Sequence, residues 1–350
     1  MLALFASRRC LSLPVPVACL AAGLCALALC MGGCESTIAV DPPDQESQLV
    51  VNSFFSNDER WVVTVSESVG AFEPVDPEAS RFDVNNADVT VTPSNGAPMA
   101  LSFTDTLTAT RVQEGPREPI GPAYVAFMPT PTAGQTYTLR AEAPGFQPVE
   151  AKSTVPAFPS MAVTSTARRV SRGGVDPNFV RQERTVTLRI DDPPNRRNRY
   201  WIEALYVDSI YVDSSDTYRI TRRSRVFTTR SRPIREEAST TLDDDGIYRG
   251  DAAFFDDALF DGTTYAIDLV FKEFFDTQRD PQRNPYVVLN VAALSPDMYD
   301  YLVSVRRYDT ASENPFAEPV TIHSNMDPGY GIFAGRHENT FVVRSELVGE

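Results

Sequence analysis

The sequence predicts a mainly β protein with two successive β-sandwiches and one amphipathic helix in its C-terminal region. Short runs rich in β-branched residues alternate apolar with polar side chains, which is the pattern of half-buried strands. Gly, Pro, Asn and Asp separate these runs, as expected for turns. One later segment instead places its apolar residues three or four positions apart, as a helix does. Together, these observations predict strands for most of the chain after residue 45.

The first predicted domain comprises residues 46–157. Seven runs with the strand pattern lie within it, a number typical of a small sandwich, and they span residues 48–56, 61–68, 87–94, 99–106, 123–129, 136–143 and 148–156. The sequence APGFQP joins the last two runs, and Gly145 in it can take a positive φ in a tight hairpin. This hairpin resembles those of immunoglobulin-like and transthyretin-like domains, so we expect a sandwich of that kind.

The second predicted domain comprises residues 158–350. The proline-bearing segment VPAFPS, residues 155–160, marks the boundary because two prolines stiffen a linker. The strand runs beyond it are longer, and they span residues 184–190, 199–212, 225–230, 264–274 and 286–294. We expect them to form a larger β-sandwich.

The predicted helix lies in the segment LSPDMYDYLVSVRRYD. Ser295 is placed to cap its first turn, and Pro296 suits the first helical position. The apolar residues fall on one face at helical spacing, namely Met298, Tyr301, Leu302 and Val305. The helix should therefore pack on a sheet or close one end of the sandwich.

Residues 1–33 have the charge order of an export signal. Arg8 and Arg9 precede an apolar run from Leu11 to Met31. The run ends in MGGC, which resembles the lipobox of bacterial lipoproteins, whose cysteine thiol is alkylated by diacylglycerol before cleavage. We therefore expect lipidation of Cys34 and a tether over residues 34–45. An uncleaved anchor and an ordinary cleaved signal peptide are the alternatives, and each of the three places the body outside the cytoplasm.

Cysteine usage and charge exclude several classes of function. All five cysteines lie at or before Cys34, which excludes framework disulfides, CxxC zinc sites and a cysteine nucleophile in the body. The formal charge is −15, and loss of the signal peptide, which carries two arginines and no acid, would make it −17. Such an acidic surface repels nucleic acid and anionic lipid headgroups. Only two lysines occur, Lys152 and Lys272; genomic base composition and a saline habitat are both possible reasons.

Motifs for catalysis or cofactor binding are not apparent. The two histidines, His323 and His337, have no HExxH spacing, and no GxSxG sequence is present. The glycine-rich stretch GYGIFAG, residues 329–335, precedes a strand pattern rather than a helix, so it does not fit a phosphate loop. We expect no catalytic residues and no cofactor, histidines that make surface or loop hydrogen bonds, and glycines that allow close turns before the last strand.

Two charged tracts each allow two interpretations. Residues 242–262 are rich in aspartate, and the favoured interpretation is turn-forming surface acids; the alternative is a calcium site with Asp243, Asp245 and Asp251 as candidate ligands. A pair of carboxylates for glycoside hydrolysis could lie among so many acids, but no spacing selects one. The basic tract at residues 219–237 fits a solvated arginine face on a long hairpin, or a contact with an anion or partner.

Several motifs resemble, in the same order, those of domain of unknown function 4249, a family of lipoproteins from Bacteroidota. They are LVVNSFF, NADVTV, YTLRAEAPGF, NRYWIEAL, FFDDALFDGTTYAIDL, LSPDMYDYLVSV and ENPFAEPVTIHSNMDPGYGIFAG. The last is the most specific, and we expect its NPFAEP part and its glycines to form a rigid loop folded back on the sandwich. The resemblance implies an accessory outer-membrane lipoprotein that accompanies a TonB-dependent receptor, and it brings no established catalytic residues.

We therefore expect an acidic protein that a lipid at Cys34 holds on the outer membrane. Its partners would be the membrane and a TonB-dependent receptor in nutrient uptake, and it would carry out no reaction. The alternatives are a carbohydrate hydrolase that uses carboxylates and a structural or adhesive surface lipoprotein. The sequence leaves open whether the body faces the periplasm or the medium.

Overall fold

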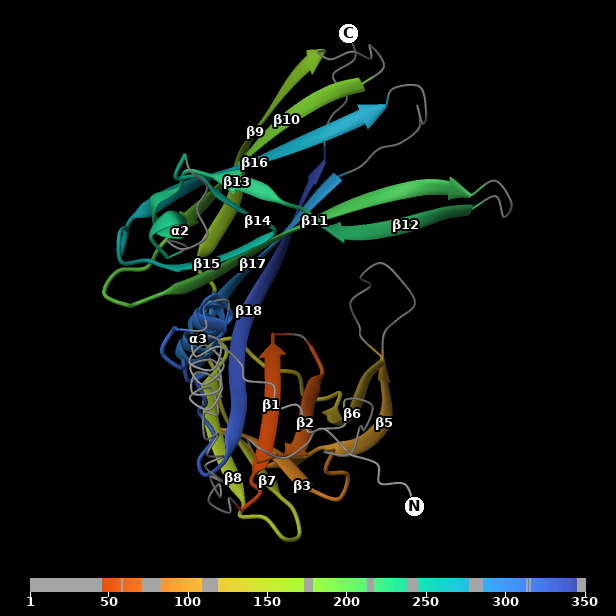
Figure 1. Ribbon diagram of the computed structural model, residues 1–350, viewed down its shortest axis with the longest axis vertical. Helices are drawn as coiled ribbons and strands as arrows, with labels where there is room; N and C mark the ends of the chain where they lie inside the picture. The colour runs from red at the N-terminus through yellow and green to blue at the C-terminus, as the bar shows by residue number, and fades with distance from the viewer. Residues whose placement is uncertain are drawn as a thin grey trace, which may run out of the picture. The chain divides into compact units, whose positions relative to one another are not determined.

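The chain is mainly β, as the sequence predicts (Figure 1). The computed structural model describes residues 46–57, 59–70, 83–108, 119–172, 179–212, 217–237, 245–276, 286–312, 314 and 316–344. The expected signal peptide, Cys34 and the expected tether lie outside these residues, and so does Asp243. Among the described residues, neither helix is long and apolar enough to cross a bilayer.

Eight strands come from the first predicted domain: β1 (Leu49–Ser56), β2 (Trp61–Glu67), β3 (Asp88–Pro93), β4 (Met99–Ala100), β5 (Ser102–Thr108), β6 (Pro119–Ala126), β7 (Thr136–Glu142) and β8 (Val149–Thr154). The elements that follow are β9 (Ser160–Arg172), β10 (Phe179–Asp191), β11 (Arg199–Val212), β12 (Thr217–Ser224), β13 (Phe227–Thr229), α2 (Arg232–Glu237), β14 (Tyr248–Gly250), β15 (Ala252–Asp256), β16 (Thr264–Asp276), β17 (Tyr286–Leu294), α3 (Pro296–Ser312) and β18 (Tyr330–Arg344).

The strands form three sheets. The largest has nine strands in the order β12-β11-β17-β18-β1-β2-β6-β5, with β15 also paired to β11. A five-stranded sheet has the order β14-β13-β16-β10-β9, and a four-stranded sheet has the order β4-β3-β7-β8. The nine-stranded sheet therefore contains strands from both predicted domains.

Two hydrophobic cores form where the smaller sheets pack against the large one. In the first, residues of β1, β2 and β6 contact residues of β3, β7 and β8. The ring of Phe55 stacks on that of Phe333 at a centroid distance of 4.5 Å and lies tilted against Trp61 at 5.0 Å. In the second, residues of β11, β15 and β17 contact residues of β10, β13, β14 and β16. Each core is thus the interior of a sandwich, and the two sandwiches share the large sheet.

Strand β18 joins the two halves of the large sheet. Its first half pairs in parallel with β1, from Val50 opposite Tyr330 to Ser56 opposite Arg336. Its second half pairs antiparallel with β17, from Leu294 opposite Arg336 to Tyr286 opposite Arg344. Residues 46–350 group as one compact unit. The boundary at residue 157 stays a prediction, and β18 contributes to cores on both sides of it.

Helix α3 confirms the one long helix that the sequence predicts. Ser295 caps it, since its Oγ accepts from the backbone N–H of Met298 at 3.3 Å. Met298 and Tyr299 are buried against Ala292 and Leu294 of β17 and against β18. The helix thus covers part of one face of the large sheet, as expected from its apolar side.

The basic tract at residues 219–237 follows the predicted long hairpin only in its first part, where β12 pairs antiparallel with β11 up to Ser224. It contains the end of β12, the short strand β13 and the helix α2. Pro233 removes a backbone donor that a strand would need, and Arg232 forms an ion pair with Glu236 one helical turn later. These local preferences favour a helical turn over a continued strand.

Candidate functional site

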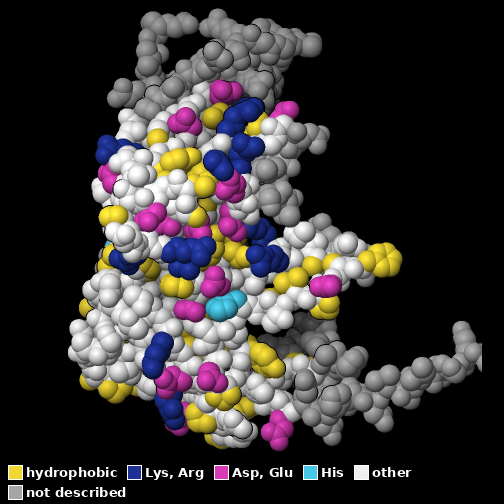
Figure 2. All heavy atoms as spheres, turned by 90° about the vertical axis from the view of Figure 1, so that its left-hand side faces the viewer, with side chains coloured by type: hydrophobic (Ala, Val, Ile, Leu, Met, Phe, Trp, Pro, Cys, Tyr) yellow, Lys and Arg dark blue, Asp and Glu magenta, His cyan; other side chains and the backbone are white. Residues whose placement is uncertain are grey.

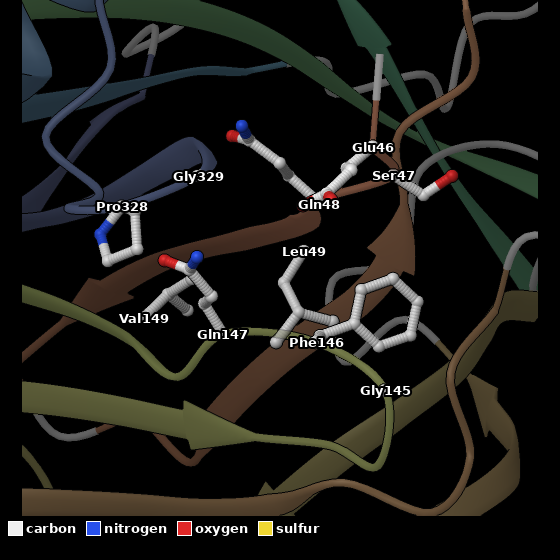
Figure 3. Close-up of a pocket in the computed structure, with 10 residues that line it drawn as sticks. All are labelled: Glu46, Ser47, Gln48, Leu49, Gly145, Phe146, Gln147, Val149, Pro328 and Gly329. Atoms are coloured by element: carbon white, nitrogen blue, oxygen red, sulfur yellow. The ribbon is translucent and has the colours of Figure 1, made fainter. Parts of the chain in front are cut away.

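A cavity of about 500 Å³ lies where β1 begins (Figure 3). Its wall comes from three segments that are far apart in the sequence: residues 46–49, residues 145–149 of the β7–β8 hairpin, and the turn at residues 328–329. All three belong to the first sandwich or to the turn that precedes β18. The cavity is the best candidate for a binding site because it combines concave shape with mixed lining.

Two glycines allow these segments to meet. Gly145 has a φ of 88°, and the backbone N–H of Phe146 donates to the carbonyl of Ala143 at 3.2 Å, which closes the predicted hairpin. Gly329 has a φ of 113°, and a Cβ there would lie 2.7 Å from the carbonyl oxygen of Leu49 and 2.9 Å from Cγ1 of Val149. Only glycine fits this approach, so the turn can lie directly against the cavity floor.

The lining of the cavity is neutral apart from one acid. Leu49 and Val149 are buried and form the apolar floor, and the ring of Phe146 is half-buried beside them. In Figure 3 the side chains of Gln48 and Gln147 extend into the space in front of Pro328 and Gly329. Within the part of the chain that the structure describes, neither side-chain carboxamide has a hydrogen-bond partner. The cavity therefore offers amide donors and acceptors above an apolar floor.

A second cluster of polar residues joins two loops of the second sandwich. Carboxylate oxygens of Asp192, Asp257 and Asp261 lie within 4.8 Å of one another, and the first two residues are buried. The aspartate-rich tract at residues 242–262 contains Asp257 and Asp261, and Asp257 is buried rather than on the surface as expected. Sequence reasoning missed Asp192 because it follows β10, whereas the other two follow β15. Of the predicted calcium ligands, Asp245 and Asp251 are exposed and lie outside the group.

Protein donors already occupy most of the buried carboxylate oxygens. The Oδ1 of Asp192 accepts from the hydroxyl of Tyr200 and from Nδ2 of Asn198 (3.1 Å), and its Oδ2 accepts from the backbone N–H of Gly262 (3.0 Å). The Oδ2 of Asp257 accepts from the backbone N–H of Asn198 (2.7 Å). Burial raises the pKa of the Asp257 carboxyl and of the Tyr200 hydroxyl. Carboxylates of this kind can ligate a hard cation. Here the hydrogen bonds of the two buried acids, Asp192 and Asp257, instead connect the loop after β10 to the loop after β15.

The match to known proteins follows the fold. A family model described as Domain of unknown function (DUF4249) matches residues 35–341. The chain belongs to the DUF4249 family. The match begins at the residue after Cys34 and ends within β18, so it includes both sandwiches and the cavity. No curated protein is significantly similar to this chain.

The two histidines of this DUF4249 chain hold loops in place, in line with the expectation. The backbone N–H of His323 donates to Oγ of Ser304, and its Nε2 lies 3.4 Å from Oδ1 of Asp297. The Nδ1 of His337 lies 3.2 Å from the carbonyl oxygen of Pro156 in the linker. Both contacts fasten a loop to a regular element.

The closing motif of the DUF4249 chain has two unlike parts. In the NPFAEP part, Phe316 is 94% exposed, so its side chain contributes nothing to a core, and the rigid loop folded back on the sandwich stays a prediction. Gly329, with a φ of 113°, lies in a close turn directly before β18, as predicted, whereas Gly331 lies within β18, where a Cβ would be 2.1 Å from the carbonyl oxygen of Val51 on the paired strand. The motif therefore presents one ring to solvent and packs its second part tightly.

Two grooves border Arg306 on the side of the molecule that carries α3, where basic and acidic side chains are interspersed (Figure 2). One, of about 330 Å³, lies between α2, β14, β15 and α3. The other, of about 480 Å³, lies between α2, α3, Asn314 and Ala317. The Arg306 guanidinium lies 4.2 Å from the ring centroid of Phe254 and donates to Oε1 of Glu237 at 2.7 Å. Arg306 thus bridges α3 to both α2 and β15.

Proposed function

We propose that this DUF4249 protein is a lipid-anchored, non-catalytic binding protein of the outer membrane that serves a TonB-dependent nutrient receptor. The observation that carries the proposal is the cavity at the start of β1. Its lining is suited to holding a ligand, and residues 46–49 of that lining follow the expected tether in the sequence.

The chemistry of the lining supports binding rather than reaction. Among the residues that line the cavity, Glu46 is the one ionisable side chain. General acid–base catalysis needs a proton donor and acceptor placed within hydrogen-bond reach of the reacting atoms. Carboxamides on Gln48 and Gln147 instead form directional hydrogen bonds without exchanging protons with a ligand. This makes the cavity suited to recognition.

The sequence before the folded body supports the anchor. Arg8 and Arg9, the apolar run and MGGC are arranged as in a lipoprotein signal peptide, and the family match starts at residue 35. Acylation adds membrane affinity in proportion to the buried methylene groups, and more than one chain gives stable anchoring. A lipid on Cys34 would hold the cavity near the membrane, within reach of a membrane receptor.

Mass spectrometry of the mature N-terminus tests the anchor. We expect protein purified from membranes to begin at Cys34, with a diacylglycerol thioether on its sulfur, and to remain in the membrane fraction. The Cys34→Ala variant should be unprocessed or soluble. Intact wild-type protein that begins at Met1 would refute the anchor, and protease treatment of whole cells would show which membrane face carries the body.

Mild crosslinking followed by purification tests the partner. A TonB-dependent receptor should be recovered with the wild type and lost with Cys34→Ala, because the variant is no longer held at the membrane. Turnover of glycans that Asp257→Asn abolishes would favour the hydrolase alternative instead. Recovery of neither a receptor nor any turnover would favour a structural or adhesive lipoprotein.

A further inference from the structure

We propose that the cavity at the start of β1 binds an extended oligopeptide, with the carboxamides of Gln48 and Gln147 pairing with its main-chain amide groups. This inference rests on the proposed binding function and names its ligand class. It concerns a site formed by residues 46–49, 145–149 and 328–329.

Complementary hydrogen bonding is the first argument. A carboxamide carries one acceptor and two donor hydrogens, so it can bond the C=O and the N–H of a peptide group together. The same protein already uses this pairing: Nδ2 of Asn325 donates to the carbonyl of Phe333 at 2.8 Å, and its Oδ1 accepts from the N–H of Phe333 at 2.9 Å. Gln48 and Gln147 present the same group without a partner among the described residues.

The shape of the cavity is the second argument. The two glutamine side chains come from different segments and reach into one space, with Leu49 and Val149 beneath them (Figure 3). An extended peptide alternates its side chains to opposite sides, so one apolar side chain can pack against the half-buried ring of Phe146 while the main chain faces the carboxamides. A volume of about 500 Å³ is within the range of ligand pockets.

Charge around the cavity selects among peptides. Glu46 lines it, and the neighbouring Asp327 is exposed beside Pro328. The backbone of Asp327 is fixed to the edge of β8 by two hydrogen bonds of 3.0 Å with the main chain of Glu150. The Glu46 carboxylate in the lining attracts a free amino terminus or a lysine side chain and repels an acidic peptide, and the exposed Asp327 adds negative charge next to Pro328 in the sequence. The expected ligand is therefore an apolar or basic peptide.

Isothermal titration calorimetry on the purified mature protein tests the inference. The probe is the C-terminally amidated tetrapeptide alanine-leucine-lysine-leucine, and the comparison probes are the tetrapeptide with glutamate in place of lysine, maltotetraose and cellotetraose. We expect binding of the basic tetrapeptide, weaker binding of the acidic one and no binding of the sugars. Gln48→Ala and Gln147→Ala should each raise Kd about tenfold, the loss of roughly one good hydrogen bond.

Asn339→Ala is the matched control, because it removes an exposed carboxamide from β18 at a position outside the cavity lining. It should leave the Kd for the peptide unchanged. No heat of peptide binding by folded wild type would overturn the inference. So would binding of the sugars alone, or peptide binding that neither glutamine substitution weakens. A receptor that still co-purifies in any of these cases would leave the proposed function standing.

Discussion

The carboxamide of Asn325 pairs with the main chain of Phe333 through two hydrogen bonds, of 2.8 and 2.9 Å. Asn325 lies in the segment between α3 and β18, and Phe333 is fully buried in the first core. The next residue, Met326, is also buried in that core. This one side chain therefore fixes the returning loop to β18 at the level where β18 runs beside β1.

Replacing Asn325 with alanine should lower the free energy of unfolding by about 1–3 kcal/mol, because the main-chain groups of Phe333 lose partners in a partly buried place. Urea denaturation followed by circular dichroism measures the change. Asn339→Ala, on an exposed part of β18, should change the stability by less than about 0.5 kcal/mol. Equal effects of the two substitutions would contradict the assigned role of Asn325.

Gly331→Ala should lower the free energy of unfolding more than an alanine substitution at an exposed glycine. Gly331 has a φ of 111°, and a Cβ there would lie 2.1 Å from the carbonyl oxygen of Val51 on the paired strand. Backbone strain and overpacking each cost about 1–3 kcal/mol. Gly134→Ala separates the two effects, because Gly134 has a φ of 78° but open space around it. We expect this variant to lose only the stability that corresponds to the backbone strain. Equal destabilisation of both variants in urea denaturation would show that the close approach to Val51 has no cost.

Local sequence patterns predicted the elements that depend on local chemistry. The runs at residues 48–56, 61–68 and 136–143 became β1, β2 and β7, because alternation decides which side chains face a core. The helix was predictable because Ser295 and Pro296 favour a helix start and the apolar spacing favours one buried face. Gly145 identified its hairpin for the same local reason.

Long-range pairing could not be predicted in this way. Nothing in the alternation of residues 330–344 shows that they pair in parallel with β1, so the shared large sheet was missed. The cavity needs the same information, since Gly329 meets Leu49 only after that pairing forms. The hydrogen-bonded cluster around Asp192 and Asp257 likewise depends on the pairing of β11 with β15. The sequence therefore predicted many of the strands and turns that carry the site residues, but not which of these segments lie side by side.

The buried Asp257 should make stability fall as the pH rises. Burial raises its pKa above the ordinary value of 3.8, although the hydrogen bond from the backbone N–H of Asn198 offsets part of this. The folded state therefore holds the proton more tightly than the unfolded state. The associated stability is fully present below the unfolded pKa and is lost as the pH rises through the folded pKa. Denaturation from pH 3 to pH 7 should show Asp257→Asn gaining stability relative to the wild type with rising pH.

The stability of Asp191→Asn relative to the wild type should change with pH in the opposite direction to that of Asp257→Asn. Asp191 is therefore the control for Asp257. Hydrogen bonds from Thr264 and Arg189 lower the pKa of the Asp191 carboxyl. Its stabilising effect is present above the unfolded pKa and is lost as the pH falls through the lower folded pKa. Asp191→Asn should therefore lose stability relative to the wild type as the pH rises from 3 to 7. Slopes of the same sign for the two variants would contradict these assignments.

Calcium should leave the thermal midpoint of the protein unchanged. Although three carboxylates lie within 4.8 Å, donors from Tyr200, Asn198 and Gly262 already satisfy Asp192. A cation would have to displace them before it gained its own oxygen ligands. Differential scanning fluorimetry with millimolar calcium checks this, since a ligand that binds only the folded state raises the midpoint. A rise that Asp261→Asn abolishes would show that the cluster is a metal site after all.

Lysine at position 306 should not preserve the stability that Arg306 provides. Its guanidinium stacks on Phe254 at 4.2 Å and donates to both the carbonyl and Oε1 of Glu237, each at 2.7 Å, so it joins α3 to β15 and to the end of α2. The ammonium group of lysine lacks the planar face that lies over Phe254, even though a single nitrogen, Nη2, donates both hydrogen bonds to Glu237. We expect Arg306→Lys to lower the free energy of unfolding by about 1–2 kcal/mol.

A double-mutant cycle shows whether that loss comes from the two contacts. Arg306→Lys combined with Glu237→Gln should lose less than the sum of the single changes, with a coupling energy of about 1 kcal/mol, because residues in one hydrogen-bonded pair are not independent. Phe254→Leu should couple to Arg306→Lys in the same direction through the lost stacking. Arg307 is exposed one position along α3, so Arg307→Lys should be nearly neutral and should not couple to Glu237. Strict additivity in both cycles would mean that Arg306 stabilises the helix by itself and does not link α2 to the large sheet.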